Sequence, residues 1–541
     1  MTPTAQLVKA TTMQKNMTTV TGGADDPDGS TLAGEVTLED VNRLRQVILS
    51  HRPVIKNIVS THGQTSVASY IASYMTKPLA SPLKNRQAEC IAAIKAEIAE
   101  RLGDEIAESS AKQLEQYYYA STTDHYGPLH HPWVLNFNLL TAGAYLADPN
   151  PVLKNIITLA CSNVSLNNFS FPRGISFTTP ADTDTERHRL SFLPSNSHSF
   201  PVYGFRPYTQ DDIKKMKAVL AQHARTGVYT KDVADRVSAI LDEVYGTEDV
   251  LACVNYADQV TLTNYRLWNK LCPPTAEKNI NFVYIEQEWV VARLMMEHHL
   301  TEKTILNQLL FDNATAEKFI RIFNEVPEAF STENKRGTYL FWYVMPECKK
   351  HRLRLWREGN FLVTDDGKYK VELTPETIRK GIESGELMPS VLLTFLTLAC
   401  YYGLTCLGGM GQTGYLPKIK DGYIALNKEL GLDENIRGCE QMYPSYLGGE
   451  MTVAFLDGPH KIFAPATSFD LLLYGTEKTF HCILEKAKKL TLEEALDPML
   501  PEDYPMHYQK KDMDPVLARI SPRAIAKLTG IDERIAACAH L

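Results

Sequence analysis

The sequence predicts a mixed α/β protein with a largely helical inserted or capping region and a disordered N-terminal tail. Three patterns support this prediction: a strand–helix–strand alternation over residues 117–163, helical periodicity over 210–330, and a β-hairpin pattern over 337–371. Of the 541 residues, 44% are hydrophobic and 22% charged, as in ordinary globular proteins. These values exclude fibrous and wholly disordered classes.

The first 36 residues are predicted to form the disordered tail. Residues 1–23 lack both the apolar core of a secretory signal and the arginines of a transit peptide, so we expect neither. Order is expected to begin at Thr37, which can cap a helix whose first turn carries Glu39 and Asp40. A second helix is predicted over 85–102.

The strand–helix–strand pattern comes next along the chain. Residues 117–123 are rich in tyrosine and threonine and favour a strand, a helix is predicted from His131, and residues 155–163 are typical of a buried strand. Parallel strands need a crossover of this kind. We therefore predict an α/β unit whose strands end near Asp124 and Ser162.

The rest of the chain alternates between helical and strand patterns. Residues 210–330 are predicted to form the helical layer, and two strands flanking the Asp365–Gly367 turn predict a hairpin. Further predicted elements are strands over 451–456 and 469–474 and helices over 477–489 and 492–496. These changes divide the chain into three predicted domains, at 37–205, 206–335 and 336–541.

Residues 387–417 contain no charged side chain over a length that would cross a bilayer. Only the stretch from Val391 to Tyr402 is densely apolar, and glycines and threonines dilute the remainder. We predict a buried helix or strand followed by a glycine-rich loop, and no membrane span.

The charge and the cysteine spacing limit the classes of partner, metal site and cellular location that we expect. The net charge of −8 and the absence of any run of five basic residues argue against nucleic acid as a partner. The basic cluster at 349–352, with Arg354 and Arg357, is interpreted as a solvated face, the alternative being an anion site. The ten cysteines include no C-x-x-C pair, which argues against zinc ribbons, iron–sulfur clusters and a disulfide framework, and favours a reducing, cytoplasmic location.

The densest candidate site is the loop from Asp124 to Pro132. Candidate metal ligands are Asp124, His125, His130 and His131, which would suit zinc or iron with one position left for water or substrate. Asp124 and His125 are also candidate catalytic groups, and Arg173 is a candidate anion clamp. The alternative is that the loop only caps the helix after it, with Asp124 accepting backbone N–H bonds.

Two other segments have the form of known ligand-binding or catalytic loops. Gly409, Gly411 and Gly414 match the G-x-G-x-x-G pattern of a nucleotide-binding loop, but Pro417 permits only a helix that starts late. Asp182 and Asp184 have the form of the nucleophile loop of haloacid-dehalogenase-like phosphatases, but the apolar strand that such a loop requires does not precede them.

The leading prediction is a cytoplasmic enzyme acting on a small polar or anionic metabolite, possible reactions being metal-assisted hydrolysis or, with iron, oxygenation. A second hypothesis is a nucleotide-dependent transferase or oxidoreductase that uses the loop from Gly409 to Gly414. A third is a non-catalytic interaction protein, favoured if the Asp124 loop is packed shut with its histidines pointing apart, with 210–330 as the partner surface. The sequence gives no oligomeric state.

Overall fold

The computed structural model describes residues 36–180, 185–195, 199–274, 278–345, 350–440, 442–458 and 462–541. The predicted disordered tail, except for Val36, and the Asp182–Asp184 pair lie outside these residues. The mixed α/β class is confirmed, with one parallel sheet, several antiparallel sheets and many helices.

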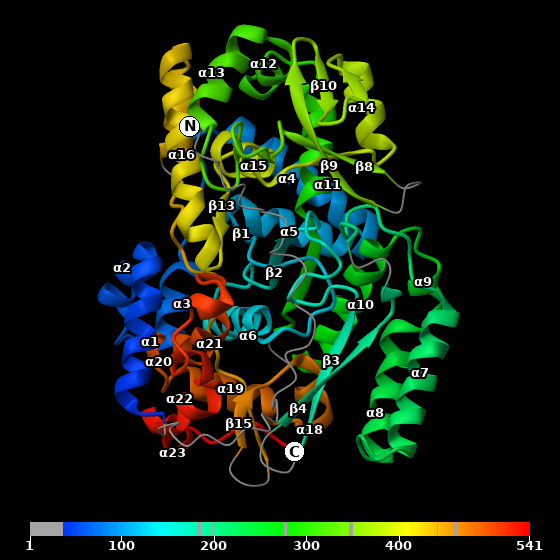
Figure 1. Cartoon of the computed structure of the whole chain (residues 1–541), viewed down its shortest axis with the longest axis vertical. Coiled ribbons are helices and arrows are strands. Elements are labelled where there is room, and N and C mark those ends of the chain that lie inside the picture. The colour runs from blue at the N-terminus through cyan, green and yellow to red at the C-terminus, as the bar shows by residue number, and fades with distance from the viewer. Residues whose placement is uncertain are drawn as a thin grey trace, which may run out of the picture.

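The centre of the fold is a four-stranded parallel sheet with the order β13-β1-β2-β5. Its strands are β13 (Thr405–Leu407), β1 (Tyr119–Ser121), β2 (Asn155–Ala160) and β5 (Asn281–Glu286). The crossover from β1 to β2 is the predicted helix, α6 (Pro132–Ala147). Figure 1 shows this sheet in the middle of the molecule.

Both faces of the sheet are buried, because successive side chains alternate between two hydrophobic cores. Ile156 and Phe282 belong to the core that also contains α3 (Val67–Met75), α6 and α10 (Tyr256–Leu271). Ile157 and Val283 belong to the core that contains α4 (Lys84–Leu102), α5 (Asp104–Gln116) and α11 (Gln287–Leu294). The near-continuous apolar runs of β2 and β5 therefore reflect burial on two sides.

The sheet draws its strands from all three predicted domains. Ser121 of β1 pairs with Leu407 of β13, and Ile157 of β2 pairs with Val283 of β5. The predicted helical region, 206–335, thus contributes β5, an edge strand of the central sheet. The boundaries at 205 and 335 do not separate independent cores.

The predicted hairpin is confirmed as part of a five-stranded antiparallel sheet, at the top of Figure 1. Its strands are β8 (Phe341–Met345), β9 (Lys350–Glu358), β10 (Phe361–Thr364), β11 (Lys370–Glu372) and β12 (Leu387–Pro389). Gly367 has φ +69°, which glycine adopts without strain in the tight turn between β10 and β11.

A helix pair and a long hairpin flank the central sheet. The hairpin is β3 (Gly174–Pro180) with β4 (Thr185–Ser191), and α7 (Gln210–Arg225) lies with α8 (Lys231–Ile240) on the outer flank (Figure 1). Other helices are α1 (Leu38–His51), α2 (Pro53–His62), α9 (Glu248–Leu251), α12 (Ile305–Phe311), α13 (Asn313–Phe323), α14 (Pro375–Glu383) and α17 (Asp433–Glu440). Thr37 caps α1 as predicted, in a capping box with Asp40.

The C-terminal part contains a small sheet of β15 (Ile462–Pro465), β14 (Phe455–Gly458) and β16 (Ala539–His540). The strand predicted over 469–474 is wrong: this segment is helix α18 (Ser468–Tyr474), which Thr467 and Asp470 initiate through a capping box. The remaining helices are α19 (Thr479–Ala487), α20 (Leu492–Leu496), α21 (Leu500–Asp503), α22 (Pro522–Thr529) and α23 (Ile531–Arg534).

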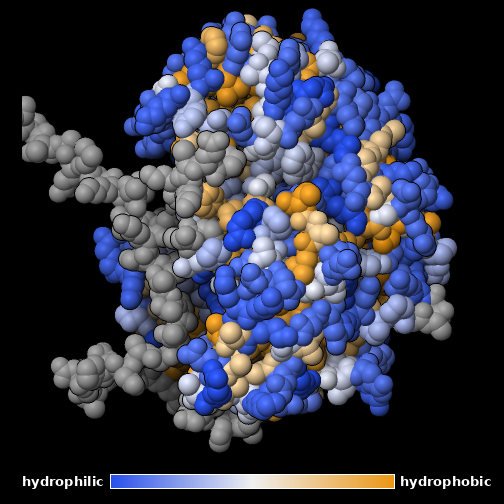
Figure 2. Space-filling model, turned by 90° about the vertical axis from the view of Figure 1, so that its right-hand side faces the viewer, coloured by the Kyte–Doolittle hydropathy of each residue, from blue (hydrophilic) through white to orange (hydrophobic). Residues whose placement is uncertain are grey.

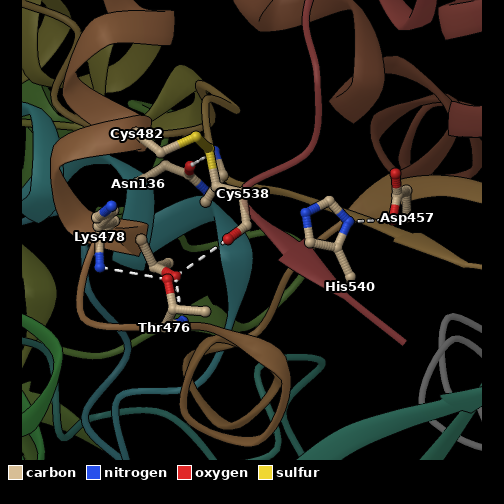
Figure 3. The surroundings of a disulfide bond; sticks show 9 residues. Asn136, Asp457, Thr476, Lys478, Cys482, Cys538 and His540 are labelled. Carbon is tan, nitrogen blue, oxygen red and sulfur yellow. Dashed lines mark hydrogen bonds and ion pairs between the residues drawn. A yellow bond between two sulfur atoms is a disulfide. The ribbon is translucent and has the colours of Figure 1, made fainter.

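One disulfide joins Cys482 of α19 to Cys538 beside β16 (Figure 3). The cysteine spacing did not indicate this bond, because the two residues are 56 positions apart and meet only through the tertiary fold. The cysteines described as free are Cys90, Cys161, Cys253, Cys272, Cys400, Cys406 and Cys439.

The charge-free segment 387–417 forms β12, the short helix α15 (Val391–Phe395), a π-helical turn, β13 and the start of α16 (Met410–Leu430). Among the described helices, none is both long and apolar enough to cross a membrane. The face drawn in Figure 2 is mostly hydrophilic, with small scattered hydrophobic areas.

Candidate functional site

The loops that follow all four parallel strands meet at one cavity of about 690 Å³. In open α/β sheets this carboxyl edge is where ligands bind, since the loops there are free of core packing. The lining residues from these loops are Thr122, Thr123 and His125 after β1, Cys161 and Asn163 after β2, Gln287 after β5, and Gly409, Gly411 and Gln412 after β13.

Other parts of the chain complete the walls. The antiparallel sheet contributes Trp342 and Arg352, and the terminal parts contribute Arg52, Glu450 and Asp503. Arg52 is neutralised by Asp503, with 2.7 Å between guanidinium nitrogen and carboxylate oxygen. The cavity is therefore built from widely separated segments of the chain.

The Asp124 loop is only partly directed to the cavity. His125 and His131 line it, whereas Asp124 and His130 are buried elsewhere. Neither Asp124 carboxylate oxygen has a hydrogen-bond partner among the described residues, and burial raises the pKa of Asp124 to about 8. A protonated carboxyl is a poor metal ligand and a poor general base, so this environment does not favour the roles predicted for Asp124.

The other two adjacent histidines have structural partners. The His130 ring nitrogen Nδ1 lies 2.8 Å from Ser176 Oγ, and burial lowers its pKa to about 3. The His131 Nδ1 atom accepts a hydrogen bond of 3.4 Å from the Trp133 backbone N–H. The predicted helix cap therefore exists, but His131 supplies it in place of Asp124.

The predicted metal ligands are not brought together. Over the described ranges, no group of three or more His, Cys, Asp or Glu side chains is arranged to hold a metal ion. The structure thus gives no support to zinc or iron at this loop. The hypothesis of an interaction protein required a loop that is packed shut. This condition is not met, because His125 and His131 line an open cavity.

His125 is held in one orientation by Asn168. Its Nδ1 atom lies 2.7 Å from Asn168 Oδ1, and that oxygen also accepts hydrogen bonds from the N–H and hydroxyl of Ser170. Since Oδ1 is an acceptor, Nδ1 carries the proton and Nε2 keeps a lone pair. Burial lowers the pKa of His125, which keeps the ring neutral at physiological pH.

The glycine-rich segment borders the same cavity. Gly409 and Gly411 line it, whereas Gly414 does not. Helix α16 begins at Met410, so the expectation that Pro417 delays the helix is wrong. The helix continues through Pro417 and loses only the N–H that would bond to the Thr413 carbonyl. A Cβ on Gly411 would meet no atom within 4 Å, so this glycine leaves open space at the cavity wall.

Arg352 is the cavity's anion-binding candidate. The sequence interpretation of a solvated face is wrong for this residue, because its guanidinium donates to the Asn163 backbone and side-chain oxygens and lies 4.5 Å from the Trp342 ring centroid. No carboxylate of the described residues lies within 4.0 Å of its nitrogens. Burial lowers its pKa, so an anionic ligand would stabilise its charge.

Glu450 is a second group that sequence reasoning missed. It has a left-handed backbone, with φ +60°, and its half-buried side chain accepts a hydrogen bond from the Met410 N–H at the start of α16. Burial raises the pKa of Glu450 to about 7. No local motif indicates this contact, because the two residues are 40 positions apart.

Comparison with known proteins adds no relative. No family model matches the chain, and no curated protein is detectably similar to it in sequence. Its class is therefore defined by the fold and the cavity alone: an α/β protein with a polar, partly aromatic cavity at the carboxyl edge of a parallel sheet.

Proposed function

We propose that the chain is an enzyme that acts on a small polar or anionic metabolite held in this cavity. The observation that carries the proposal is that the cavity combines the Arg352 guanidinium, which has no carboxylate partner among the described residues, with the imidazole of His125, which Asn168 orients. Its volume of about 690 Å³ is within the range of small-molecule sites, about 300–1,000 Å³.

The two residues have complementary roles. Arg352 would bind a carboxylate or phosphate through its planar fork of N–H donors, and its stacking on Trp342 limits its freedom before binding. His125 would accept a proton from the ligand at Nε2, while Asn168 holds the ring and stabilises the imidazolium that forms. Glu450, which lines the same cavity and has a pKa near neutrality, would be a second group able to exchange protons there.

The hydrolytic and oxygenase reactions of the sequence prediction depended on a metal. Among the described residues, the Asp124 loop does not offer a group of ligands for zinc or iron. The proposed chemistry is proton transfer at a substrate bound through its negative charge. Arg352 would supply the anion-binding group and His125 the proton acceptor.

A nucleotide is the second candidate ligand, favoured by one observation. Gly409 and Gly411, at the start of α16, line the same cavity as His125. A truncation experiment would not separate the two hypotheses, since both halves of the chain build the cavity. The ligand has to be distinguished by direct binding.

Isothermal titration calorimetry on the full chain tests the proposal. The probes are citrate, inorganic phosphate, adenosine monophosphate and adenosine, each titrated into the parent, Arg352→Gln and an Arg321→Gln control. Arg321 is an exposed arginine on α13, with its side chain 61% accessible. A charged hydrogen bond contributes about 1.5–3 kcal/mol, so we expect Arg352→Gln to weaken anion binding about 10- to 100-fold. Equal affinities in parent and Arg352→Gln, or no binding of any probe, would overturn the proposal.

A further inference from the structure

The β3–β4 hairpin carries three arginines in one place. Arg187 and Arg189 are alternate residues of β4 and so extend from the same face, opposite Thr178 and Ser176 of β3. Arg173 directly precedes β3. The guanidinium carbons of Arg173 and Arg189 lie 5.3 and 5.2 Å from the centroid of one ring, that of Phe171.

In the described part of the chain these three positive charges have no close ion-pair partner, and the carboxylates of Glu502 and Asp470 act on them only from a longer distance. None of the three has a carboxylate within 4.0 Å of its nitrogens there. The Arg173 Nε atom is buried and has no hydrogen-bond partner. Partial burial lowers the pKa of Arg189, and the charges of Arg187 and Arg173 lower it further. An anion at this cluster would bond the buried Arg173 donor and reduce the repulsion among the three arginines.

None of the three arginines lines the cavity itself, but the Phe171 ring that Arg173 and Arg189 contact lies 6.3 Å, centroid to centroid, from His130, the neighbour of His131. Arg187 and Arg189 influence His131, which lines the cavity and whose pKa burial and these arginines hold far below its usual value. Burial raises the pKa of Glu502, and Arg187 and Arg189 partly offset this effect. The Glu502 Oε2 atom lies 3.9 Å from His131 Nε2. Ser170, another lining residue, is three positions from Arg173.

We propose that Arg173, Arg187 and Arg189 bind a phosphate group whose parent molecule occupies the cavity. This inference rests on the proposed function and names its substrate class, a small phosphorylated metabolite. A phosphate monoester carries close to two negative charges and three terminal oxygens, which suit several guanidinium forks. A single carboxylate would be satisfied by Arg352 alone.

The Phe171 backbone contributes to this arrangement. Its backbone φ of +55° is a left-handed conformation that residues other than glycine rarely adopt. The Phe171 ring lies within cation–π distance of both Arg173 and Arg189, and this contact would orient both guanidiniums before a ligand arrives. The unusual backbone thus has a function in positioning the two arginines.

The test is calorimetric titration of inorganic phosphate, adenosine monophosphate and adenosine into the full chain. The variants are Arg187→Gln with Arg189→Gln as a double substitution, Arg173→Gln, and an Arg225→Gln control. Arg225 is an exposed arginine at the end of α7. We expect the double variant to bind phosphate at least 10-fold more weakly than the parent, and Arg225→Gln to bind it normally. Circular dichroism melting confirms that each variant is folded.

The outcomes separate this inference from the proposed function. Unchanged phosphate affinity in the double variant overturns the inference, as does a parent that binds no phosphate. If citrate binding then still depends on Arg352, the proposed function stands without the phosphate site. If adenosine monophosphate binds more tightly than inorganic phosphate and both depend on the cluster, the ligand is a phosphate ester and not free phosphate.

Discussion

The imidazole Nδ1 of His125 lies 2.7 Å from the side-chain oxygen of Asn168. Asn168 is not free to turn its amide nitrogen toward the ring, because the same oxygen accepts a 3.2 Å hydrogen bond from the Ser170 N–H. The tautomer of His125 is therefore determined by Asn168, a residue 43 positions away in the sequence. This pair decides which nitrogen of His125 is available to a ligand.

We expect Asn168→Leu to release this tautomer. Nitrogen-15 NMR of labelled histidine, assigned with a His125→Gln spectrum, should show Nδ1–H alone in the parent and a mixture of tautomers in Asn168→Leu. The pKa of His125 should fall further, since burial lowers it and the hydrogen bond to Asn168 raises it. Ser176→Ala, which alters the partner of His130 instead, is the control. An unchanged tautomer and pKa in Asn168→Leu would show that Asn168 does not orient the ring.

Asp124 gives a prediction about stability and pH. Its pKa in the folded chain is about 8, above the unfolded value of about 3.9, so the folded state holds an extra proton between these two values. The free energy of unfolding should therefore decrease as pH rises from about 4 to about 8, by up to about 1.4 kcal/mol per pH unit. Asp124→Asn stays neutral and should lack this decrease. Urea denaturation at pH 5, 6.5 and 8 measures the difference.

The comparison for Asp124 is Asp235→Asn, an exposed carboxylate of α8 paired with Lys231. Asp235→Asn should leave the pH dependence of the parent unchanged. Identical pH profiles for the parent and Asp124→Asn would mean that Asp124 is ionised in the folded protein, contrary to its buried and unbonded environment.

Local signals predicted local structure correctly, and the site was missed where its contacts are distant. Thr37 with Asp40, and the turn at Gly367, have short-range sequence patterns that the structure confirms. The capping box of Thr467 and Asp470 was also visible, but the apolar run after it was interpreted as a strand. A run of this length does not by itself distinguish a buried helix from a strand.

Arg352 shows why the cavity could not be assembled from the sequence. Its hydrogen-bond partner, Asn163, is 189 residues away, and the basic residues around Arg352 suggested a solvated face. The predicted strand ends at Asp124 and Ser162 did identify one edge of the cavity. The pairing of β13 with β1, which brings the glycine-rich segment to that edge, has no local signal.

Gly411 tests whether the cavity holds a ligand against α16. Gly411→Ala should leave the fold intact, since its Cβ meets no atom within 4 Å, and should stabilise the helix by about 0.5–1 kcal/mol. Gly411→Leu should also fold but should occupy cavity volume and weaken binding of the tightest probe at least 10-fold. Gly414→Leu is a matched control, because Gly414 lies on the same helix with open space around it and does not line the cavity. Equal binding by the two leucine variants would place the ligand away from α16.

The disulfide between Cys482 and Cys538 gives the last prediction (Figure 3). Cys538 also bonds through its backbone N–H to Phe455 and through its carbonyl to Thr479, so the crosslink fixes an already structured segment. A bond that closes a loop of this length contributes about 2–4 kcal/mol, chiefly by restricting the unfolded chain. Replacing both cysteines by alanine should lower the free energy of unfolding by that amount under oxidising conditions, and dithiothreitol should destabilise the parent to the level of the variant. The control Cys253→Ala should respond to dithiothreitol as the parent does. Two results together would show that the bond does not form: a parent stability that reductant does not change, and reaction of Cys482 and Cys538 with iodoacetamide after purification without reductant. Absence of the bond would agree with the predicted reducing, cytoplasmic location.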